Sequence, residues 1–446
     1  MSSARLLFFA EAVTLAHLAR PAVLAAALSG RHQVTLARPS RSAAFVDDPR
    51  IRCVDLDCIP GADFLAAIAA GRPPWPESIL ERYVATDLAL IDAQRPDLII
   101  GDLRLSLSVS ARLRGVPYLA ISNAYWSPWY REPPPLPVLP WTARVPLPIA
   151  RAAFALLRGP ALAWHARPLD RVRRSHGLPP LGASLRRAYT DADWLALADV
   201  PELYPTPGAP PTHRHLGAIP WSPPAARLPA AWGRSPRGRP PIAYLSLGSS
   251  GQRELAGAAI DGLLAAGFEV WHACAGDAPV RPGRPAVREA AWLPGALACA
   301  RADIVVCNGG SLGVQQALAA ARPIVAIASN MDQFLNMGPV ASAGAGRLLR
   351  ADRATAETVR AAAAELVGDP RARVAARRLA RLIAAHPAVD RFRELVADIL
   401  DPSRHPSQGA YDAPDQPAAD RGLRRAVRAG RGAGGPGSNA SGRGSA

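Results

Sequence analysis

The sequence predicts an α/β protein made of two doubly wound domains. Short apolar runs of strand type alternate with helix-forming segments in residues 1–222, and the same alternation resumes at Ile242. A stretch dense in proline, from Pro201 to Pro241, separates the two series. A chain of 446 residues, 49% of them hydrophobic, is long enough to build two cores.

The first series opens with a strand, a helix and a second strand, and further strands follow. The expected elements are strands over Arg5–Ala10, Val34–Ala37, Pro96–Asp102 and Val116–Ile121, and a helix over Pro21–Leu28. His17 lies between the first strand and this helix, and Asp102 ends a later strand. Both residues are therefore expected at the carboxyl edge of the sheet, where open α/β sheets hold their ligands.

The second series places polar groups and glycines after its strands. The expected elements are strands over Ile242–Leu247, Ile304–Cys307 and Ile324–Ala328, a glycine turn at Gly309 and Gly310, and a helix over Gly313–Ala321. A strand, a glycine turn and a helix N-terminus together offer backbone N–H groups to a phosphate. This arrangement predicts a phosphate-binding loop.

Other residues extend that loop into a nucleotide-sugar pocket. We expect Ser249, Asn308, Gly309, Gly310 and Ser311 to hold a diphosphate through hydroxyl, amide and backbone N–H groups. The remaining candidates are Trp292, whose indole suits stacking on a base, and Asp332 and Gln333, which suit adjacent sugar hydroxyls. Taken singly, each has an ordinary structural explanation, such as a core tryptophan or a helix cap.

This series of motifs resembles the donor signature of family-1 (UDP-glycosyltransferase-like) glycosyltransferases, which move a hexose from a nucleoside diphosphate to an acceptor hydroxyl. Six elements fall in order: Trp292–Gly295, Asn308–Ser311, Gln316–Leu318, Ala321–Pro323, Asp332–Gln333 and Gly344–Gly346. The resemblance implies the GT-B fold, two facing Rossmann-like domains with a cleft between them. It also implies that Gln316 occupies the position of the residue that binds the ribose.

The sequence departs from the family pattern at four positions. Gly295 replaces a glutamine at the base, Asn308 a histidine at the diphosphate, Gln316 a glutamate at the ribose, and Ala321 a glycine. The change at Gln316 weakens the case for UDP over dTDP. The departures at Gly295, Asn308 and Gln316 keep open a second reading, a catalytically silent homologue that binds nucleotide sugar as an auxiliary partner. An epimerase of similar architecture is disfavoured because the Asp-Gln signature belongs to transferases.

The resemblance also assigns catalytic roles. His17 stands where the family carries its catalytic histidine, and Asp102 where it carries the carboxylate that orients this histidine. An imidazole that takes the proton of an attacking hydroxyl, held by a buried carboxylate, suits direct displacement with inversion. We expect no metal and no cofactor, with a UDP or dTDP sugar as co-substrate.

In this family the part of the first domain equivalent to residues 133–180 walls the acceptor pocket. Here it is rich in proline, leucine and tryptophan and contains an apolar, arginine-bearing helix expected over Ile149–Ala166. An apolar wall favours a small hydrophobic or lipid-like acceptor. Ordinary core and interdomain packing explains the same residues equally well.

Composition limits the other partners. All 52 basic residues are arginine, which indicates coding bias, and the net charge of +16 is therefore discounted. The sequence has no basic cluster interleaved with aromatic residues, so nucleic acid is not expected as a partner. A basic surface remains compatible with anionic donors and with peripheral contact to a membrane. Five cysteines without zinc-type spacing, and no apolar run long enough to span a bilayer, predict a cytoplasmic protein.

The expected organisation has five parts. They are an acceptor-binding domain (1–222), a proline-rich linker (223–241), a nucleotide-sugar-binding domain (242–387), a helix returning to the first domain (388–402) and a disordered tail (403–446).

Overall fold

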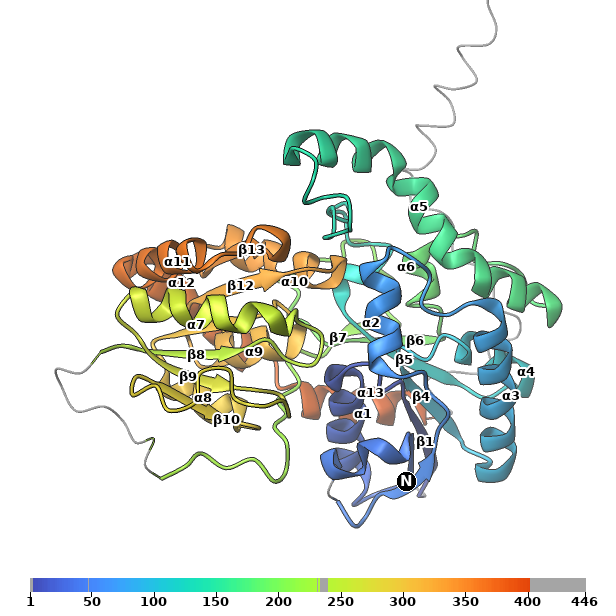
Figure 1. Cartoon of the computed structure of the whole chain (residues 1–446). Coiled ribbons are helices and arrows are strands. Elements are labelled where there is room, and N and C mark those ends of the chain that lie inside the picture. The colour runs from blue at the N-terminus through green and yellow to red at the C-terminus, as the bar shows by residue number, and fades with distance from the viewer. Residues whose placement is uncertain (1–2, 47, 231, 233–239, 402–446) are drawn as a thin grey trace, which may run out of the picture. The chain divides into compact units, whose positions relative to one another are not determined.

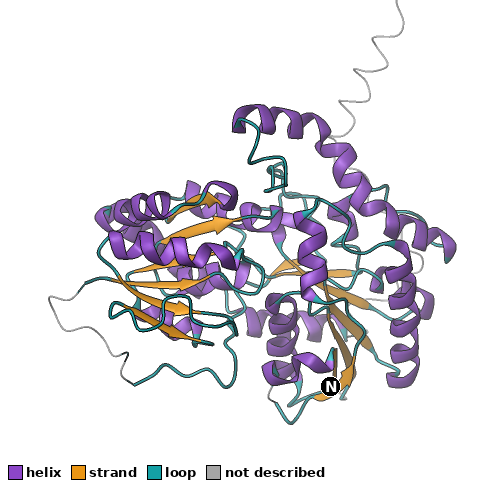
Figure 2. Ribbon diagram, viewed as in Figure 1, coloured by secondary structure: helices purple, strands orange, loops and turns teal. Residues whose placement is uncertain are grey.

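The structure is a computed structural model that describes residues 3–46, 48–230, 232 and 240–401. The tail expected to be disordered, residues 403–446, lies outside the described residues, as do linker residues 231 and 233–239. The described chain contains two parallel sheets with helices on their faces, which is the predicted α/β class (Figure 2).

The first sheet has seven strands, all parallel. Across the sheet they are β3 (Arg52–Asp55), β2 (Gln33–Arg38), β1 (Arg5–Ala10), β4 (Leu98–Asp102), β5 (Tyr118–Ser122), β6 (Trp194–Leu197) and β7 (His213–His215). The helices of this half are α1 (Leu15–Leu28), α2 (Gly61–Ala69), α3 (Glu77–Gln94), α4 (Leu107–Arg114), α5 (Leu147–Ser175) and α6 (Leu185–Ala188), with short 3-10 helices at Ser40–Phe45 and Ala124–Trp126. The central strands β1, β4 and β5 are apolar and buried, as expected for a parallel sheet covered on both faces.

The second sheet has six strands, also all parallel. In order they are β10 (Val287–Ala290), β9 (Glu269–Ala273), β8 (Ile242–Ser246), β11 (Ile304–Cys307), β12 (Ile324–Ala328) and β13 (Gly346–Arg350). The helices of this half are α7 (Ala256–Ala265), α8 (Gly295–Arg301), α9 (Ser311–Ala319), α10 (Met331–Ser342), α11 (Ala356–Gly368) and α12 (Pro370–Ala384), with short 3-10 helices at Arg253–Leu255 and Ala351–Arg353. The last helix is α13 (Ala388–Ile399).

Each sheet reverses its strand order at one point, and polar residues follow the strands there. In the first sheet β1 lies beside β4, and Ala10 pairs with Asp102. In the second, β8 lies beside β11, and Ser246 pairs with Cys307. Loops leave the sheet in opposite directions at such a switch point and open a crevice at the carboxyl ends of the strands. The topology therefore predicts two ligand sites, one in each half.

The first helix begins earlier than the sequence suggests. We expected it to start at Pro21, with His17 in the preceding loop, but α1 runs from Leu15 and carries His17 in its first turn. Pro21 lies inside the helix, where it cannot donate the hydrogen bond that an ordinary residue gives to the carbonyl four positions back. Burial of the helix face that contains Leu18 and Leu24 outweighs this loss.

Two further elements differ from expectation in the proline-rich parts of the chain. Helix α5 continues past Ala166 to Ser175, because its last turns are buried and anchored. There the Asp170 carboxylate accepts the backbone N–H groups of Leu181 and Ala183. Strand β7, which the sequence did not predict, is a three-residue edge strand within the proline-dense stretch.

Helix α13 packs on the first sheet rather than on the second. The ring of Phe392 lies 6.3 Å from that of Phe8 on β1, and Arg393 donates to the carbonyl of Ala27 on α1. Figure 1 shows α13, drawn in red-orange, beside α1. Within the described part of the chain, no helix has both the length and the apolar character that crossing a membrane requires.

Candidate active site

A large cavity lies where the carboxyl ends of the two sheets meet. Its volume is about 310 Å³, and it is lined by residues from both halves. Three contacts join the halves at its rim: the N–H of Leu15 donates to Ser249 Oγ, the indole of Trp126 donates to the Asp332 carboxylate, and Phe45 lies edge-on to Trp292. Both switch points open into this cavity.

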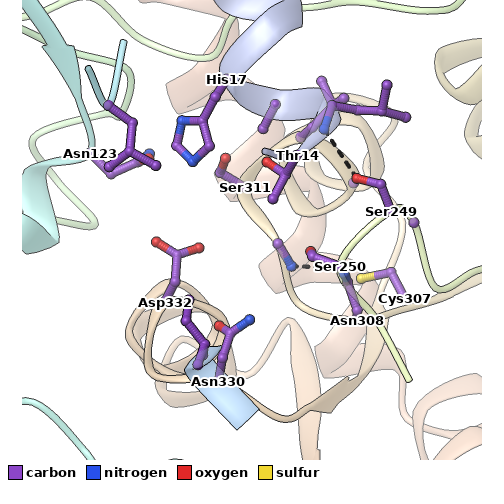
Figure 3. Close-up of a pocket in the computed structure, with 18 of the residues that line it drawn as sticks. Thr14, His17, Asn123, Ser249, Ser250, Cys307, Asn308, Ser311, Asn330 and Asp332 are labelled. Carbon is purple, nitrogen blue, oxygen red and sulfur yellow. Dashed lines mark hydrogen bonds between the residues drawn. The ribbon is translucent and has the colours of Figure 1, made fainter. Parts of the chain in front are cut away.

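His17 and Asp102 meet at the first switch point. The Nδ1 atom of His17 lies 2.7 Å from Oδ1 of Asp102. The carboxylate is inaccessible to solvent, whereas the His17 side chain keeps 20% exposure. Figure 3 shows the imidazole facing the same open space as Asp332. The adjacent strands thus bring together two residues that lie 85 positions apart in the sequence.

Arg20 completes this group, and the sequence reasoning missed it. Its Nε and Nη2 atoms each lie 2.7 Å from one oxygen of Asp102, and Nη2 also lies 2.9 Å from His17 Nδ1. Burial by itself lowers the pKa of the guanidinium, but the charge and hydrogen bonds of Asp102 outweigh burial and raise it. The signal was present, because residues three apart share a helix face.

The network extends one step deeper. Arg20 donates to the side-chain oxygen of Asn123, whose amide in turn donates to Asp199. Burial raises the pKa of Asp199 to about 6, opposed by hydrogen bonds from the Ala124 N–H and the Asn123 amide. These residues fix the position of Arg20, and through it that of Asp102.

The second switch point is built from uncharged groups. Asn308 donates through Nδ2 to Ser250 Oγ, and its Oδ1 accepts the N–H of Gly310. Ser249, Asn308 and Ser311 line the cavity (Figure 3), and so does Gly310. Gly310 supplies no side-chain cap to α9, so the first N–H groups of that helix have no capping acceptor. They are available to an anion.

Gly309 and Gln333 form structural contacts around this loop, and neither is among the residues that line the cavity. Gly309 has a positive φ of 82°, and its carbonyl accepts the amide of Asn336. Gln333 is buried and forms a capping box with Asn330 at the start of α10. Its Nε2 atom also donates to the carbonyl of Ser250. The expected contact of Gln333 with a sugar is therefore replaced by local hydrogen bonds, which side chains near a helix start readily make.

Asp332, Trp292 and Gln316 do line the cavity. Asp332 lies in the first turn of α10, and Trp292 lies just before α8. The amide of Gln316 donates to the carbonyl of Trp221.

Two departures from the family pattern form one structural unit. A Cβ atom added at Gly295 would lie 2.3 Å from Oε1 of Gln316. The amide of Gln316 thus fills the space in which a side chain at position 295 would begin. The two positions are therefore in direct contact, a relation that their separation in the sequence conceals.

One cluster in the described residues has ligand types suited to a metal: His272, Cys274 and Glu289. Its groups are already engaged with one another and with the backbone. Glu289 accepts hydrogen bonds from His272 and from the N–H groups of Val280 and Arg281. Burial raises the pKa of Cys274 to about 11, which keeps the thiol protonated at neutral pH.

Comparisons with known proteins agree with this architecture. Residues 277–399 match the family model described as "Erythromycin biosynthesis protein CIII-like, C-terminal domain". Among solved structures, the glycosyltransferase SsfS6 of Streptomyces sp. SF2575 has a TM-score of 0.63 at 18% identity, covering 88% of this chain and 99% of that one. The spinosyn rhamnosyltransferase SpnG has a TM-score of 0.61 at 19% identity, covering 88% and 100%.

Curated relatives are closer in sequence. A PGL/p-HBAD biosynthesis rhamnosyltransferase of Mycobacterium bovis (strain BCG / Pasteur 1173P2) is 42% identical over 377 residues, which cover 84% of this chain and 83% of that protein. A PGL/p-HBAD biosynthesis glycosyltransferase of Mycobacterium tuberculosis (strain ATCC 25177 / H37Ra) is also 42% identical, over 84% and 88%. The chain is a glycosyltransferase with the GT-B fold and belongs to the family-1-like group that includes these mycobacterial enzymes.

Proposed function

We propose that this glycosyltransferase moves a hexose from a nucleoside diphosphate to a hydroxyl of an apolar acceptor, with inversion at the anomeric carbon. One observation carries the proposal. The His17–Asp102 pair and the uncapped N-terminus of α9 line the same cavity, one at each switch point. A base for the acceptor and an anion site for the leaving group therefore share one space.

The acceptor hydroxyl loses its proton to His17 as it attacks the anomeric carbon. For this, the Nδ1–H of His17 must donate to Asp102, which leaves Nε2 unprotonated. If Nδ1 instead accepts from Arg20, the proton sits on Nε2 and the imidazole cannot act as a base there. The Asp102 carboxylate thus selects the productive tautomer against a competing cation.

The leaving diphosphate takes the bonding electrons and gains negative charge. We assign its stabilisation to Asn308, Ser249 and the first N–H groups of α9, whose helix dipole favours an anion. Asp332 is assigned to the sugar hydroxyls and Trp292 to the base. Metal is not required in this scheme, and we expect the rate to be unchanged when divalent ions are chelated.

The donor proposal is refined by the relatives. The Mycobacterium bovis relative and SpnG are both named rhamnosyltransferases, and one structure of SpnG is described as complexed with thymidine diphosphate. These names favour a deoxyhexose donor carried on dTDP, with UDP as the alternative.

The acceptor wall is apolar. Phe64, Leu103 and Leu139 line the cavity on the side of the first half, together with Phe154 and Leu162 of α5. Such a wall suits an aromatic or lipid-like alcohol, since binding buries apolar surface.

A second candidate is a silent homologue that binds nucleotide sugar without transferring it. Its support is an inactive PGL/p-HBAD biosynthesis glycosyltransferase of Mycobacterium bovis (strain BCG / Pasteur 1173P2), 42% identical over 252 residues, which cover 56% of this chain and 68% of that protein. The Gly295–Gln316 unit also departs from the family pattern.

A donor screen separates the two candidates. The purified full chain is incubated with dTDP and UDP sugars and a panel of apolar alcohols, and the anomeric configuration of any product is read by NMR. Transfer with inversion is expected. Nucleotide binding without transfer across the panel would favour the silent homologue, and a retained configuration would refute the displacement mechanism.

A further inference from the structure

One face of the first half exposes an unusual number of large apolar side chains. Among the described residues, seven large hydrophobic side chains are exposed, and five of them lie between positions 141 and 164. These five, which we call the α5 face, are Trp141, Ile149, Leu156, Leu157 and Trp164. Leu156 is 82% exposed and Leu157 is 62% exposed. Leaving such side chains in water is unfavourable unless a partner covers them.

The spacing of these residues places them on one side of α5. Within α5, positions 149 and 156 lie seven residues apart, and so do positions 157 and 164. This spacing keeps all four on one side of the helix. Phe154, Leu162 and His165 of the same helix instead line the cavity. Figure 1 shows α5 as a long helix at the edge of the drawing. One helix therefore presents one side to the acceptor cavity and another side to solvent.

The charges around the face have a single sign. Residues 133–169 contain four arginines, at 144, 151, 158 and 167, and no aspartate or glutamate. Arg144 and Arg167, each three residues after an exposed tryptophan of the face, are exposed, and neither forms an ion pair with another described residue. Arg151 and Arg158 lie on the opposite side of α5. The face is thus apolar, with a guanidinium group near each of its two ends.

The segment before α5 is held in place, so its exposed residues do not reflect poor packing. Thr142 donates to Asp352, Arg350 donates to the carbonyl of Leu136, and Arg353 donates to the carbonyl of Val145. Trp141 therefore lies in an anchored segment, and α5 itself is held by its buried residues Ala150, Phe154 and Ala166.

We infer that the α5 face docks on the surface of an anionic lipid bilayer. Apolar side chains flanked by arginines match an interface in which acyl chains lie beneath negatively charged headgroups. Trp141 and Trp164 suit the headgroup level, because an indole combines an apolar body with a polar N–H. No described helix can span a membrane, so the contact is peripheral. Docking would place the opposite side of α5, and the cavity, next to lipid-borne acceptors.

This inference goes beyond the proposed transfer reaction, and its test needs neither donor nor acceptor. The full chain is sedimented with vesicles of phosphatidylcholine alone and with vesicles in which about one-third is phosphatidylglycerol. We expect binding to the anionic vesicles and a decrease in binding as the salt concentration rises. Equal binding to both kinds of vesicle, or binding to neither, would overturn the inference.

Two double variants locate the contact. Leu156→Glu with Leu157→Glu should lower partitioning by about tenfold or more. Leu297→Glu with Val374→Glu adds the same charge at the two exposed apolar residues outside the face, and should bind like the parent. Leu156→Gln with Leu157→Gln, which adds no charge, should also bind weakly.

The remaining outcomes count against lipid as the partner. If the control pair loses as much binding as the α5 pair, general charge rather than the face controls partitioning. If light scattering shows that the parent is a dimer and the Leu156→Glu, Leu157→Glu variant a monomer, the face joins two copies of the chain. Circular dichroism of each variant establishes that it is folded.

Discussion

The two switch points have the same topology and opposite chemistry. At β1 and β4, a buried cation and a buried carboxylate surround His17. At β8 and β11, the groups that face the cavity are hydroxyls, an amide and backbone N–H groups. Among the described residues that line the cavity, Arg20 is the one arginine, and its guanidinium forms an ion pair with Asp102.

Under the proposed mechanism, this difference shows how one fold assigns proton transfer and donor binding to its two halves. Proton transfer needs a titratable group held in one tautomer, and a buried ion pair fixes geometry at the cost of desolvation. A diphosphate must bind and then leave, which neutral donors at a helix N-terminus permit without an additional charge. Changes at the first switch point should therefore affect rate, stability and pH dependence, and changes at the second should affect affinity.

The largest effect is expected at the proposed catalytic pair, His17 and Asp102. His17→Ala should slow transfer by roughly 10²–10⁴-fold, the usual scale for loss of a general base. Asp102→Asn should act in the same direction, because an amide does not stabilise the cation and can favour the wrong tautomer. Steady-state rates with a competent acceptor from the screen measure both. Parental rates in both variants would refute the mechanism.

Arg20 should influence both stability and the base. Arg20→Gln leaves Asp102 buried without its bidentate partner and should cost about 3–5 kcal/mol of unfolding free energy. Removing a cation beside His17 favours the imidazolium, so the acidic limb of the pH–rate profile should move to higher pH.

Urea unfolding and the pH–rate profile test these effects separately. A shifted limb in a folded variant supports Arg20 as a positioning residue. If the Arg20→Gln variant loses stability but the acidic limb of its pH–rate profile does not move, the role of Arg20 is structural alone.

Asp199 predicts a pH-dependent stability. Its pKa is raised to about 6 when folded, above the usual value of about 3.9, so the folded state binds the proton more tightly. The contribution of Asp199 to the free energy of unfolding is therefore lost as pH rises from about 4 to 6. Relative to Asp199→Asn, which does not titrate, the parent should lose up to roughly 3 kcal/mol across this window.

Urea unfolding at pH 4 and pH 7 measures this difference. Asp97→Asn provides a control of opposite sign, because hydrogen bonds from Arg5 hold the pKa of Asp97 below its usual value. A pH-independent difference for Asp199 would contradict the assignment.

At the second switch point, Asn308→Ala should weaken nucleoside diphosphate binding by about 1.5–3 kcal/mol, the scale of one charge-assisted hydrogen bond. Asn308→Asp keeps the shape and adds repulsion, so it should bind still more weakly. Calorimetry measures both affinities. Unchanged affinity in a folded Asn308→Ala variant would remove Asn308 from the donor site.

The smallest effect concerns nucleotide choice. Because Gln316 is tied to the Trp221 carbonyl, UDP and dTDP should compete with similar strength. Gln316→Glu should shift this ratio toward UDP by less than about tenfold. A hundredfold preference for UDP in the parent would show that another residue binds the ribose.

The sequence predicted what depends on strand order and on the edge of a parallel sheet. Asp102 ends a buried strand and His17 follows its neighbour, so their proximity follows from topology alone. Arg20 escaped prediction because we placed His17 in a loop, and a helix start at Leu15 was needed to put both residues on one face.

Other features depend on local competition for hydrogen bonds and space. Gln333 resembles a sugar-binding residue in sequence, yet the N–H groups at the start of α10 engage its side chain. The relation between Gly295 and Gln316 is steric and becomes visible only when both positions are placed. Neither leaves a signal in the periodicity of the chain.

The central claim is that the first switch point performs chemistry while the second holds the donor. Calorimetric titration of His17→Ala with dTDP and UDP tests it most directly, with Asn308→Ala titrated alongside. The account predicts parental nucleotide affinity in His17→Ala and weakened affinity in Asn308→Ala. If His17→Ala loses as much affinity as Asn308→Ala, the division of labour between the two switch points is wrong.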